Sequence, residues 1–509
     1  MKKAIRATAA ALAMIAATAH LAFGGPEDEQ AGSTASDRAP VCVGDAGTAL
    51  DRFLSGYVED LRTLYVTRNF DARRLDGVVF AGMEPAVFHT AVRTLLALQG
   101  EAAFVVFHLD PTRICAFIWA STSLEGAPEG FFGLPEAPVR FAYANRPLDR
   151  EEFLDDARQA VETIASRIPL GEARAGIRDA PAQTAEMPRG ATPLLAAGTS
   201  ADPRELLGRV ARQLALPEVT SALDATRQIT LHLPGELAFL PLLALPLDGD
   251  RPLVETHAVT AIDRLTALLT LPGINADAGL PINRVGALLD WGQRGDYSLR
   301  LMTWSHGAED GIAFLGDPEI LSPAAFAGYR FEPLPGARQE AEELARRFNA
   351  EPVLGPHATR SAMLDRLRSS RVLHFAGHGV GSAEDPLENS FLVLSDGPLT
   401  AREIQAEMLN EALIVLSACD TGRGQALGAG VIGLARAFQK AGALGTVLSH
   451  WPVSDRSAVP FMLSFHDELT RNPPAEALRS AALQLRQDYP HPADWAAFGY
   501  FGTPLLLIQ

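Results

Sequence analysis

The chain has 509 residues, of which 47% are hydrophobic and 21% are charged. This length suffices for about two or three domains, each with its own core. The chain carries 44 Lys and Arg residues against 61 Asp and Glu, a net charge of −17, without a local basic cluster. Such a balance repels a phosphate backbone and argues against nucleic acid as a partner.

Residues 1–24 are predicted to be a signal peptide. A basic start at residues 1–6 precedes an uncharged, Ala-rich run at residues 7–23, with small residues where a signal peptidase reads, for example Ala17 and Ala19. A transmembrane anchor is the competing interpretation, but the run is short of the roughly 20 strongly apolar residues of a span. We therefore expect an exported protein, periplasmic or secreted, with no integral membrane span beyond this segment.

The N-terminal half reads as a mixture of helices and strands. Residues 25–49 are polar and are expected to form a tether, followed by an amphipathic helix from residue 50 to about residue 65. Strand-like runs at residues 104–109 and 114–120 predict a hairpin. A second amphipathic helix is predicted at residues 148–168, so that residues 50–171 form an α+β segment.

Residues 172–203 are rich in Ala, Pro and Thr without periodicity, and are expected to form a flexible linker. Structure resumes with a predicted helix at residues 206–214 and a strand at residues 229–233. This strand runs into a turn at Pro234-Gly235-Glu236.

From about residue 284 onward, helices alternate with short apolar strands. The strands are predicted at residues 312–315, 391–394 and 445–449 and in two runs that lead to His378 and Cys419. The helices are predicted at residues 337–348, 361–367 and 431–440 and after a capping box that begins at Thr400. This alternation favours a mostly parallel sheet covered by helices on both faces.

The three cysteines are Cys42, Cys115 and Cys419. In an exported protein, an odd number suggests that one thiol is kept out of pairing. A Cys42–Cys115 disulfide would leave Cys419 free, and the alternative that all three are reduced stays open. Neither arrangement provides a metal site, because no Cys or His cluster has ligand spacing. We predict no metal and no cofactor.

Two of the predicted strands stop at a reactive side chain followed by glycine. Residues 371–379 (RVLHFAGHG) contain His378, and residues 413–422 (LIVLSACDTG) contain Cys419. In an open α/β sheet, ligand-binding and reactive residues cluster at the ends of the strands. These two side chains are therefore expected to lie in one site. A thiol nucleophile needs such an imidazole to take its proton or to hold it as a thiolate. The motifs therefore predict a cysteine peptidase, a hydrolase.

A longer series of motifs resembles the CHAT domain, a bacterial relative of caspases and separases among the caspase-fold cysteine peptidases. The matching segments are residues 234–237, 240–242, 334–338, 371–379, 399–400, 416–422, 451–455 and 494–498, within roughly residues 205–509. The resemblance implies a caspase-like three-layer α/β sandwich for residues 284–509. Similarity to separases implies a degenerate pseudo-protease half, made of residues 50–171 and 204–283. Tetratricopeptide repeats often precede this domain, but no such repeat is visible here.

The resemblance also implies a Cys–His dyad. Cys419 would attack the scissile carbonyl and form a thioester, with His378 as its proton partner. His374 lies four residues earlier and is expected to be a buried structural histidine. The family pattern places the oxyanion between the backbone N–H groups of Cys419 and Gly379, where glycine lets the backbone approach the substrate.

Substrate selection is expected to involve residues 451–455 (WPVSD), which are similar to a Trp-x-Val-x-Asp run in separases that prefer arginine at the cleaved position. Asp455 would then receive a basic side chain, and Trp451 would form an apolar wall. The alternative interpretation makes Asp455 the N-cap of the next helix. Asp420, beside the nucleophile, either lines the same pocket or fixes the turn.

Other interpretations concern the glycine-rich residues 422–430. A dinucleotide site is disfavoured, because the third glycine comes one residue late and the next strand ends in His450-Trp451 rather than an acidic residue. We expect a flexible loop with Arg423 as an autoprocessing point. A protein or peptide is the expected substrate, and an activating partner protein is a further candidate. The rival hypothesis is a catalytically silent caspase-like scaffold or interaction protein.

Overall fold

The computed structural model describes most of the chain outside its N-terminus and two long internal segments. The described residues are 39–67, 84–123, 125, 137–168, 177–178, 202–247, 249–262, 265, 311–326, 329–331, 333–409, 412–418, 421–422, 424–427 and 430–502. The predicted signal peptide and most of the predicted linker lie outside these ranges, as do Cys419, Asp420 and Arg423.

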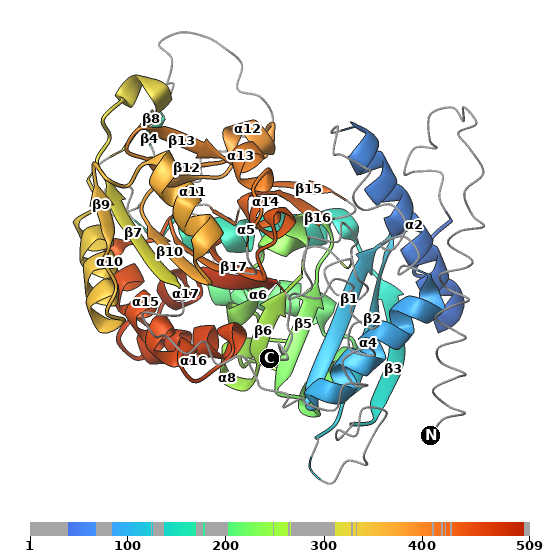
Figure 1. Ribbon diagram of the computed structural model, residues 1–509. Coiled ribbons are helices and arrows are strands. Elements are labelled where there is room, and N and C mark those ends of the chain that lie inside the picture. Colours follow the sequence, from blue (N-terminus) through green and yellow to red (C-terminus); the bar gives the residue numbers. More distant parts are fainter. Residues whose placement is uncertain are drawn as a thin grey trace, which may run out of the picture.

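An 11-stranded sheet runs through the described part of the molecule (Figure 1). From one edge to the other its strands are β3 (Val139–Pro147), β2 (Arg113–Ser121), β1 (Ala102–Leu109), β5 (Gln228–His232), β6 (Ala258–Ala261), β18 (Phe498–Gly502), β17 (Gly445–Ser449), β14 (Leu413–Ser417), β10 (Val372–Ala376), β7 (Ile312–Pro318) and β9 (Val353–Gly355). Strands β1, β2 and β3 pair antiparallel, as do β17 and β18, and all other neighbours are parallel. The predicted hairpin and the mostly parallel sheet are thus confirmed.

The sheet joins the two halves that the sequence suggested. The first five strands in this order, from β3 to β6, come from the N-terminal half. The other six, from β18 to β9, come from the C-terminal half. They meet where Ala261 of β6 pairs in parallel with Phe501 of β18. The two halves therefore share one hydrogen-bonded sheet.

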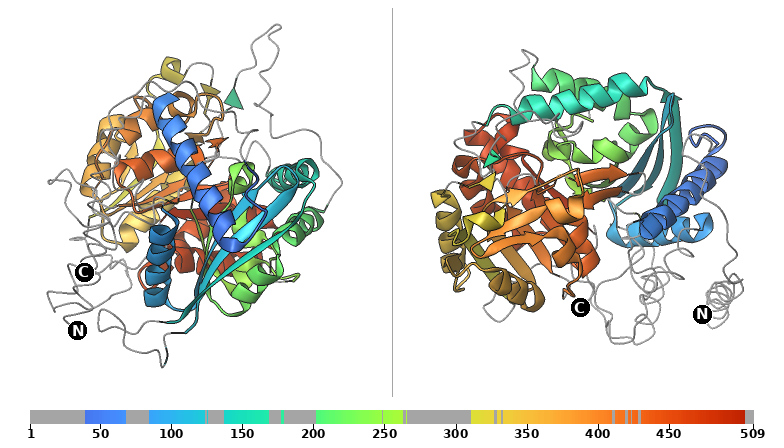
Figure 2. Two further views of the ribbon diagram at one scale, coloured as in Figure 1. Left: turned by 90° about the vertical axis from the view of Figure 1, so that its right-hand side faces the viewer. Right: turned by 90° about the horizontal axis from the view of Figure 1, so that it is seen from above.

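Helices cover both faces of the N-terminal part of the sheet. Alternate residues of β1 and β2 pack either with α2 (Ala46–Thr67) and α4 (Pro85–Gln99) or with α5 (Arg150–Ala165), α6 (Pro203–Leu214) and α7 (Pro217–Asp224). Figure 2 shows α2 and α5 on opposite sides of these strands. This alternation is the period of two that places successive side chains of a strand on opposite faces.

The C-terminal part is also a three-layer arrangement. His374 of β10 contacts α10 (Pro335–Arg347) and α15 (Asp455–Leu469) on one face. Leu373 and Phe375 point to the other face, because side chains alternate along a strand. Their core cluster includes apolar residues of α11 (Arg360–Ser369), α13 (Ala401–Gln405) and α14 (Leu434–Ala441). Helix α16 (Pro474–Asp488) packs on α15. The predicted α/β fold class is confirmed.

Local sequence signals begin several helices where expected. The Asp149 side chain accepts a hydrogen bond from the Glu152 N–H at the start of α5. Thr400 and Glu403 form the predicted capping box of α13. Pro335 opens α10, where its missing N–H costs nothing.

The Cys42–Cys115 disulfide is present, with the two Cα atoms 5.3 Å apart. Asp110 accepts hydrogen bonds from the backbone N–H groups of Val41 and Cys42. Both residues are buried, so this stretch of the predicted polar tether is fastened to the sheet instead. A link between residues 73 apart typically stabilises a fold by about 2–4 kcal/mol.

The glycine-rich stretch after β14 differs from the prediction. Strands β15 (Gly424–Leu427) and β16 (Gly430–Gly433) form an antiparallel hairpin, and α14 begins at Leu434 rather than near residue 431. The β-branched residues Val431 and Ile432 suit a strand. An added Cβ at Gly424 would collide with the backbone of Ile432, which explains a glycine there.

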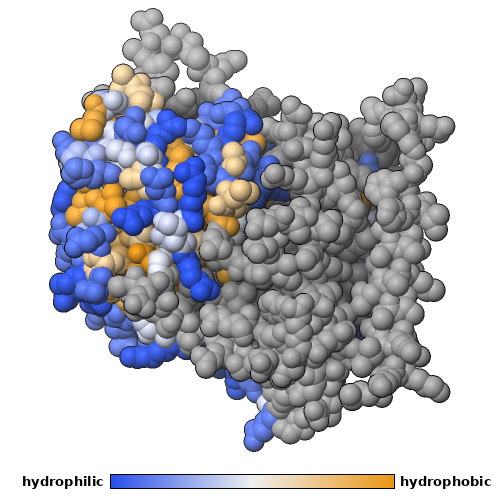
Figure 3. Space-filling view, viewed as in Figure 1, coloured by the Kyte–Doolittle hydropathy of each residue, from blue (hydrophilic) through white to orange (hydrophobic). Residues whose placement is uncertain are grey.

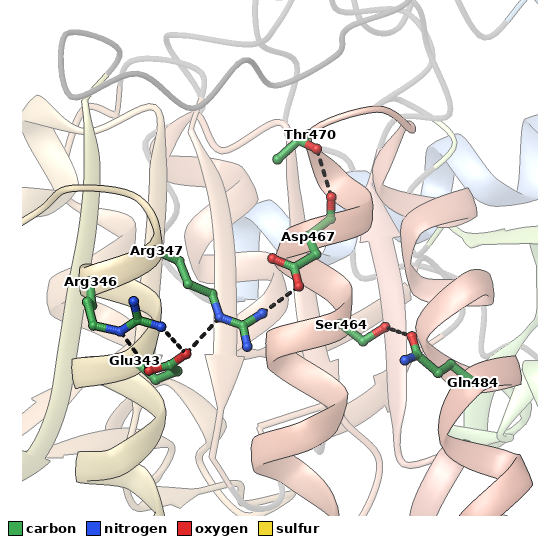
Figure 4. A network of polar contacts seen from close by, with 7 residues as sticks. All are labelled: Glu343, Arg346, Arg347, Ser464, Asp467, Thr470 and Gln484. Carbon is green, nitrogen blue, oxygen red and sulfur yellow. Dashed lines mark hydrogen bonds and ion pairs between the residues drawn. The ribbon is translucent and has the colours of Figure 1, made fainter.

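Polar contacts on the surface tie α10 to α15, and α15 to α16 (Figure 4). Arg347 lies between Glu343 of its own helix and Asp467 of α15. Ser464 of α15 donates to Gln484 of α16 over 2.6 Å. Exposed pairs of this kind contribute little, on the order of 0–1 kcal/mol each, so the buried contacts described below carry most of the attachment.

The coloured surface in Figure 3 mixes hydrophilic residues with smaller apolar areas. The exposed large apolar side chains of the described residues, Val43, Leu321 and Met408, come from separate parts of the chain. Within the described ranges, no helix combines the length and the apolar character of a membrane span.

Candidate active site

Two strands that precede the predicted dyad end level with each other. Strands β10 and β14 are parallel neighbours, and their last residues, Ala376 and Ser417, pair in register. The Gly377 N–H donates to the Ser417 carbonyl oxygen over 3.2 Å. His378 follows Ala376 by two residues, and Cys419 follows Ser417 by the same interval in the sequence.

His378 lies in the turn between β10 and β11 (Gly379–Val380), with 5% of its surface exposed. Strand β11 pairs antiparallel with β12 (Phe391–Leu394), which pairs with β13 (Gly397–Thr400). The His378 carbonyl oxygen accepts a hydrogen bond from the Val393 N–H over 3.1 Å. The backbone on both sides of the imidazole is therefore held by strands.

The Gly379 N–H points away from β12. Gly379 pairs with Leu392, and the flanking bond from Val393 N to the His378 carbonyl identifies this pair as the type without direct hydrogen bonds. The ladder therefore leaves the Gly379 N–H on the side opposite to β12. That is the orientation a backbone donor needs to serve another acceptor.

An aromatic cluster that was not predicted from the sequence lies beside His378. The Phe331 ring is 5.0 Å from the His378 ring, and Tyr329 stacks on Phe331 with ring centres 5.9 Å apart. Phe326 and Phe391 complete this aromatic cluster. The closely spaced aromatic residues 326, 329 and 331, just ahead of Leu334-Pro335-Gly336, were the available signal.

Cys419, the predicted nucleophile, lies outside the described residues, but hydrogen bonds hold the chain on both sides of it. The Ser449 hydroxyl, at the end of β17, donates to the Ala418 carbonyl oxygen over 2.6 Å. The Ser449 N–H donates to the Thr421 hydroxyl over 3.1 Å, and the Gly422 N–H donates to the Ser449 carbonyl oxygen over 2.9 Å. Thus Ser449 holds the chain before Cys419 and after Asp420.

Asp455 links the N-termini of two helices. Its Oδ2 accepts a hydrogen bond from the Gly336 N–H, in the first turn of α10, over 2.9 Å. An added Cβ at Gly336 would collide with this carboxylate, which explains the glycine of the Leu334–Arg338 motif. The N-cap of α15 is Ser454, whose side chain accepts from the Arg456 N–H. The alternative that made Asp455 the N-cap was therefore wrong by one residue.

Trp451 is completely buried, and its indole N–H donates to the Ala493 carbonyl oxygen over 2.9 Å. In this arrangement it exposes no surface to a substrate. The described structure gives it a role in core packing, in place of the expected apolar wall. Asp420 lies outside the described residues.

His374 is a buried structural residue, as expected. Its Nε2 lies 2.8 Å from Glu340 Oε1 of α10, and its Nδ1 lies 3.1 Å from His466 Nε2 of α15. All three side chains have no exposed surface. We call Glu340, His374 and His466 the buried triad. It joins helices α10 and α15 to β10, the strand that leads to His378.

His450 follows β17 directly and is buried among apolar groups. Burial lowers the pKa of His450 from its usual 6.5 to about 4, because the imidazolium loses its hydration. As the pH falls from about 6.5 to 4, the unfolded chain takes up a proton that the folded chain does not. The free energy of unfolding should therefore fall by about 3 kcal/mol across this window.

The variant His450→Gln should lose this pH dependence. The check is urea unfolding at several pH values from 4 to 7, in which the wild-type loss exceeds that of the variant. His357→Gln, at an exposed histidine, is the matched control and should follow the wild type. Parallel curves for His450→Gln and the wild type would contradict this account.

The described residues include no group of three or more His, Cys, Asp or Glu side chains arranged to hold a metal ion. Their candidate groups are the His378 imidazole and the adjacent Gly379 N–H at the end of β10, and the Asp455 carboxylate at the start of α15. Acyl transfer uses groups of these kinds: an imidazole to accept a proton and a backbone N–H to stabilise an oxyanion. A carboxylate can bind a basic side chain of the substrate.

Comparison with curated proteins finds two relatives, both named tetratricopeptide repeat protein 28. The one from Mus musculus is 24% identical over 323 residues, covering 55% of this chain and 12% of the relative. The one from Homo sapiens is 25% identical over 235 residues, covering 38% of this chain and 9% of the relative. The chain thus spans only about a tenth of the length of the relatives it matches.

Solved structures of peptidases are also similar. A Saccharomyces cerevisiae separase–securin complex matches 90% of this chain and 34% of its own chain, with 10% identity and a TM-score of 0.46. The Arg-specific cysteine proteinase gingipain R matches 60% of this chain and 68% of its own chain, with 13% identity and a TM-score of 0.36.

The family model described as the CHAT domain matches residues 204–503. The match covers more than half of the chain and begins where the predicted linker ends. It includes the strands that lead to His378 and Cys419 and the segment that contains Asp455. The chain therefore belongs to the CHAT domain family.

Proposed function

We propose that this protein is a cysteine endopeptidase in which Cys419 is the nucleophile and His378 is its proton partner. One observation carries the proposal. Ala376 and Ser417 end adjacent parallel strands in register, and the histidine and the cysteine each follow two residues later. Side chains at matched positions beyond paired strands are within reach of each other.

The reaction follows from these residues. The Cys419 sulfur attacks the scissile carbonyl carbon while the His378 imidazole takes the thiol proton. The carbonyl oxygen becomes an oxyanion that the Gly379 and Cys419 N–H groups stabilise, and each such donor is worth roughly 3 kcal/mol of barrier. His378 then protonates the leaving amine, and water hydrolyses the thioester to a carboxylic acid and the free thiol.

Asp455 is our candidate for selecting a basic residue at the cleaved position. Its carboxylate belongs to the helix that follows β17, and the Gly336 N–H fixes its orientation. A positioned carboxylate pairs well with a guanidinium or ammonium group. The family relation to separases, whose Trp-x-Val-x-Asp run resembles residues 451–455, supports the same assignment.

Export of the protein is also part of the proposal. The Cys42–Cys115 disulfide supports it, because disulfides persist in oxidising compartments such as the periplasm or the extracellular space. The basic, Ala-rich N-terminus supports it independently. Mass spectrometry of the N-terminus of protein recovered outside the cytoplasm tests this directly.

Cleavage of a fluorogenic peptide library tests the peptidase and its preference. We expect peptides with Arg or Lys at the cleaved position to be favoured. Asp455→Asn should lower kcat/KM for Arg peptides by about tenfold to hundredfold, because it removes the charge but keeps an acceptor for Gly336. Asp317→Asn is the matched control, since the Asp317 carboxylate in β7 also contacts α10 but pairs there with Arg338.

Two outcomes would count against the proposal. Equal kcat/KM for Arg peptides in Asp455→Asn and Asp317→Asn would remove Asp455 from specificity. Absence of hydrolysis by the wild type, with and without calcium, reductant and candidate partner proteins, would favour the rival function. That rival is a scaffold, which the tetratricopeptide repeat relatives make the natural alternative.

A further inference from the structure

A short strand from the linker pairs with the peptidase half. Strand β4 (Ile177–Arg178) lies antiparallel to β8 (Tyr329–Arg330), with Ile177 opposite Arg330 and Arg178 opposite Tyr329. The two strands form a separate two-stranded sheet among the described residues, visible beside β13 in Figure 1. Residues 172–203 showed no periodicity in the sequence, so the pairing was not expected.

Strand β8 is anchored beside the candidate catalytic histidine. Tyr329 stacks on Phe331, the residue after β8, and Phe331 contacts the His378 ring. The turn η8 (Pro323–Phe326) and β12 support β8 through Phe326 and Phe391. The position of β8 relative to His378 is therefore fixed by the aromatic cluster rather than by β4.

The edge of β8 suits an extended peptide. Main-chain pairing with an exposed strand gives affinity that tolerates many sequences, which is what an endopeptidase needs along its substrate. A strand advances about 3.3 Å per residue. Since Phe331 directly follows β8, a paired peptide needs only a few more residues to reach the imidazole.

We propose that β8 is the edge to which an extended substrate segment pairs, and that β4 of the linker holds this edge in the resting chain. The inference rests on the proposed peptidase function. The linker is then an intramolecular competitor of the substrate. A tethered segment competes at an effective concentration of about a millimolar, while a pairing of two residues stays weak enough for substrate to displace it.

The test is a full-length variant with Ile177→Pro and Arg178→Pro. Proline lacks the N–H that a strand ladder needs, so β4 should no longer pair. We expect KM for a fluorogenic peptide to fall about fivefold, the equivalent of one net backbone hydrogen bond, with kcat unchanged. Gln183→Pro with Thr184→Pro, in the same linker, is the matched control and should keep the wild-type KM. An unchanged KM in the β4 variant would overturn the proposal.

Hydrogen exchange separates docking of β4 from catalysis. In the Cys419→Ala background, the amides of residues 329–331 should be protected, and the β4 prolines should speed their exchange while the control prolines do not. Equal exchange in both variants would show that β4 does not hold this edge. If no chain hydrolyses peptide, the proposed function fails and competition fails with it, whereas the exchange data still decide the docking.

Discussion

Replacing Cys419 or His378 with alanine should abolish peptide hydrolysis, with kcat reduced by about 10⁴-fold or more. Without the thiol no thioester forms, and without the imidazole the thiol keeps its proton. Because the two residues act as one unit, the double variant should be hardly slower than either single variant. The measurement is steady-state hydrolysis of the best library peptide, alongside alkylation of Cys419 by a thiol probe.

The controls for this prediction are built into the chain. His357→Ala changes an exposed histidine and should leave kcat and the alkylation rate as in the wild type. Alkylation of Cys419 should slow in His378→Ala, because a thiol without its partner is a poorer nucleophile. A strictly multiplicative loss in the double variant, or fast alkylation without His378, would mean that the two residues do not form a dyad.

Prediction from sequence worked where a signal is local. The β10 and β14 runs are continuous, apolar and buried, as parallel strands covered on both faces should be. The hairpin of β1 and β2 and the capping box at Thr400 were equally readable, because turn and cap chemistry depends on a few neighbouring residues. His374 could be assigned to the core, since it sits inside such a run.

Contacts between residues that are far apart in the sequence could not be predicted. The pairing of β6 with β18, which joins the halves, connects residues 240 positions apart, Ala261 and Phe501. Asp455 showed a local helix start, but its actual acceptor role toward Gly336 spans 119 positions. The Gly-rich stretch resembled a loop because glycine weakens strand propensity. It nevertheless forms strands, because β15 and β16 pair with each other.

The coupling between the core and the candidate site is also a product of distant contacts. Helices α10 and α15 are linked at their first turns by the bond from Gly336 to Asp455, and both pack on β10 through the buried triad. The exposed pair of Arg347 and Asp467 in Figure 4 adds only weak attachment between the same helices. A substitution in the buried triad should therefore lower the stability of the fold and also disturb the end of β10, next to His378.

His374→Ala should accordingly lower the free energy of unfolding by about 3–5 kcal/mol, because two buried partners each lose a hydrogen bond at a cost of about 1–3 kcal/mol. These partners are Glu340 and His466, which lie in a place that water does not reach. Glu340→Gln retains the acceptor oxygen and the shape, so its loss should be smaller, about 1–2 kcal/mol. Urea unfolding of both variants, with Ser464→Ala at a surface hydrogen bond of α15 as the control, measures the difference. A cost for His374→Ala no larger than that of Ser464→Ala would mean that the triad contributes nothing net to holding α10 and α15 on the sheet.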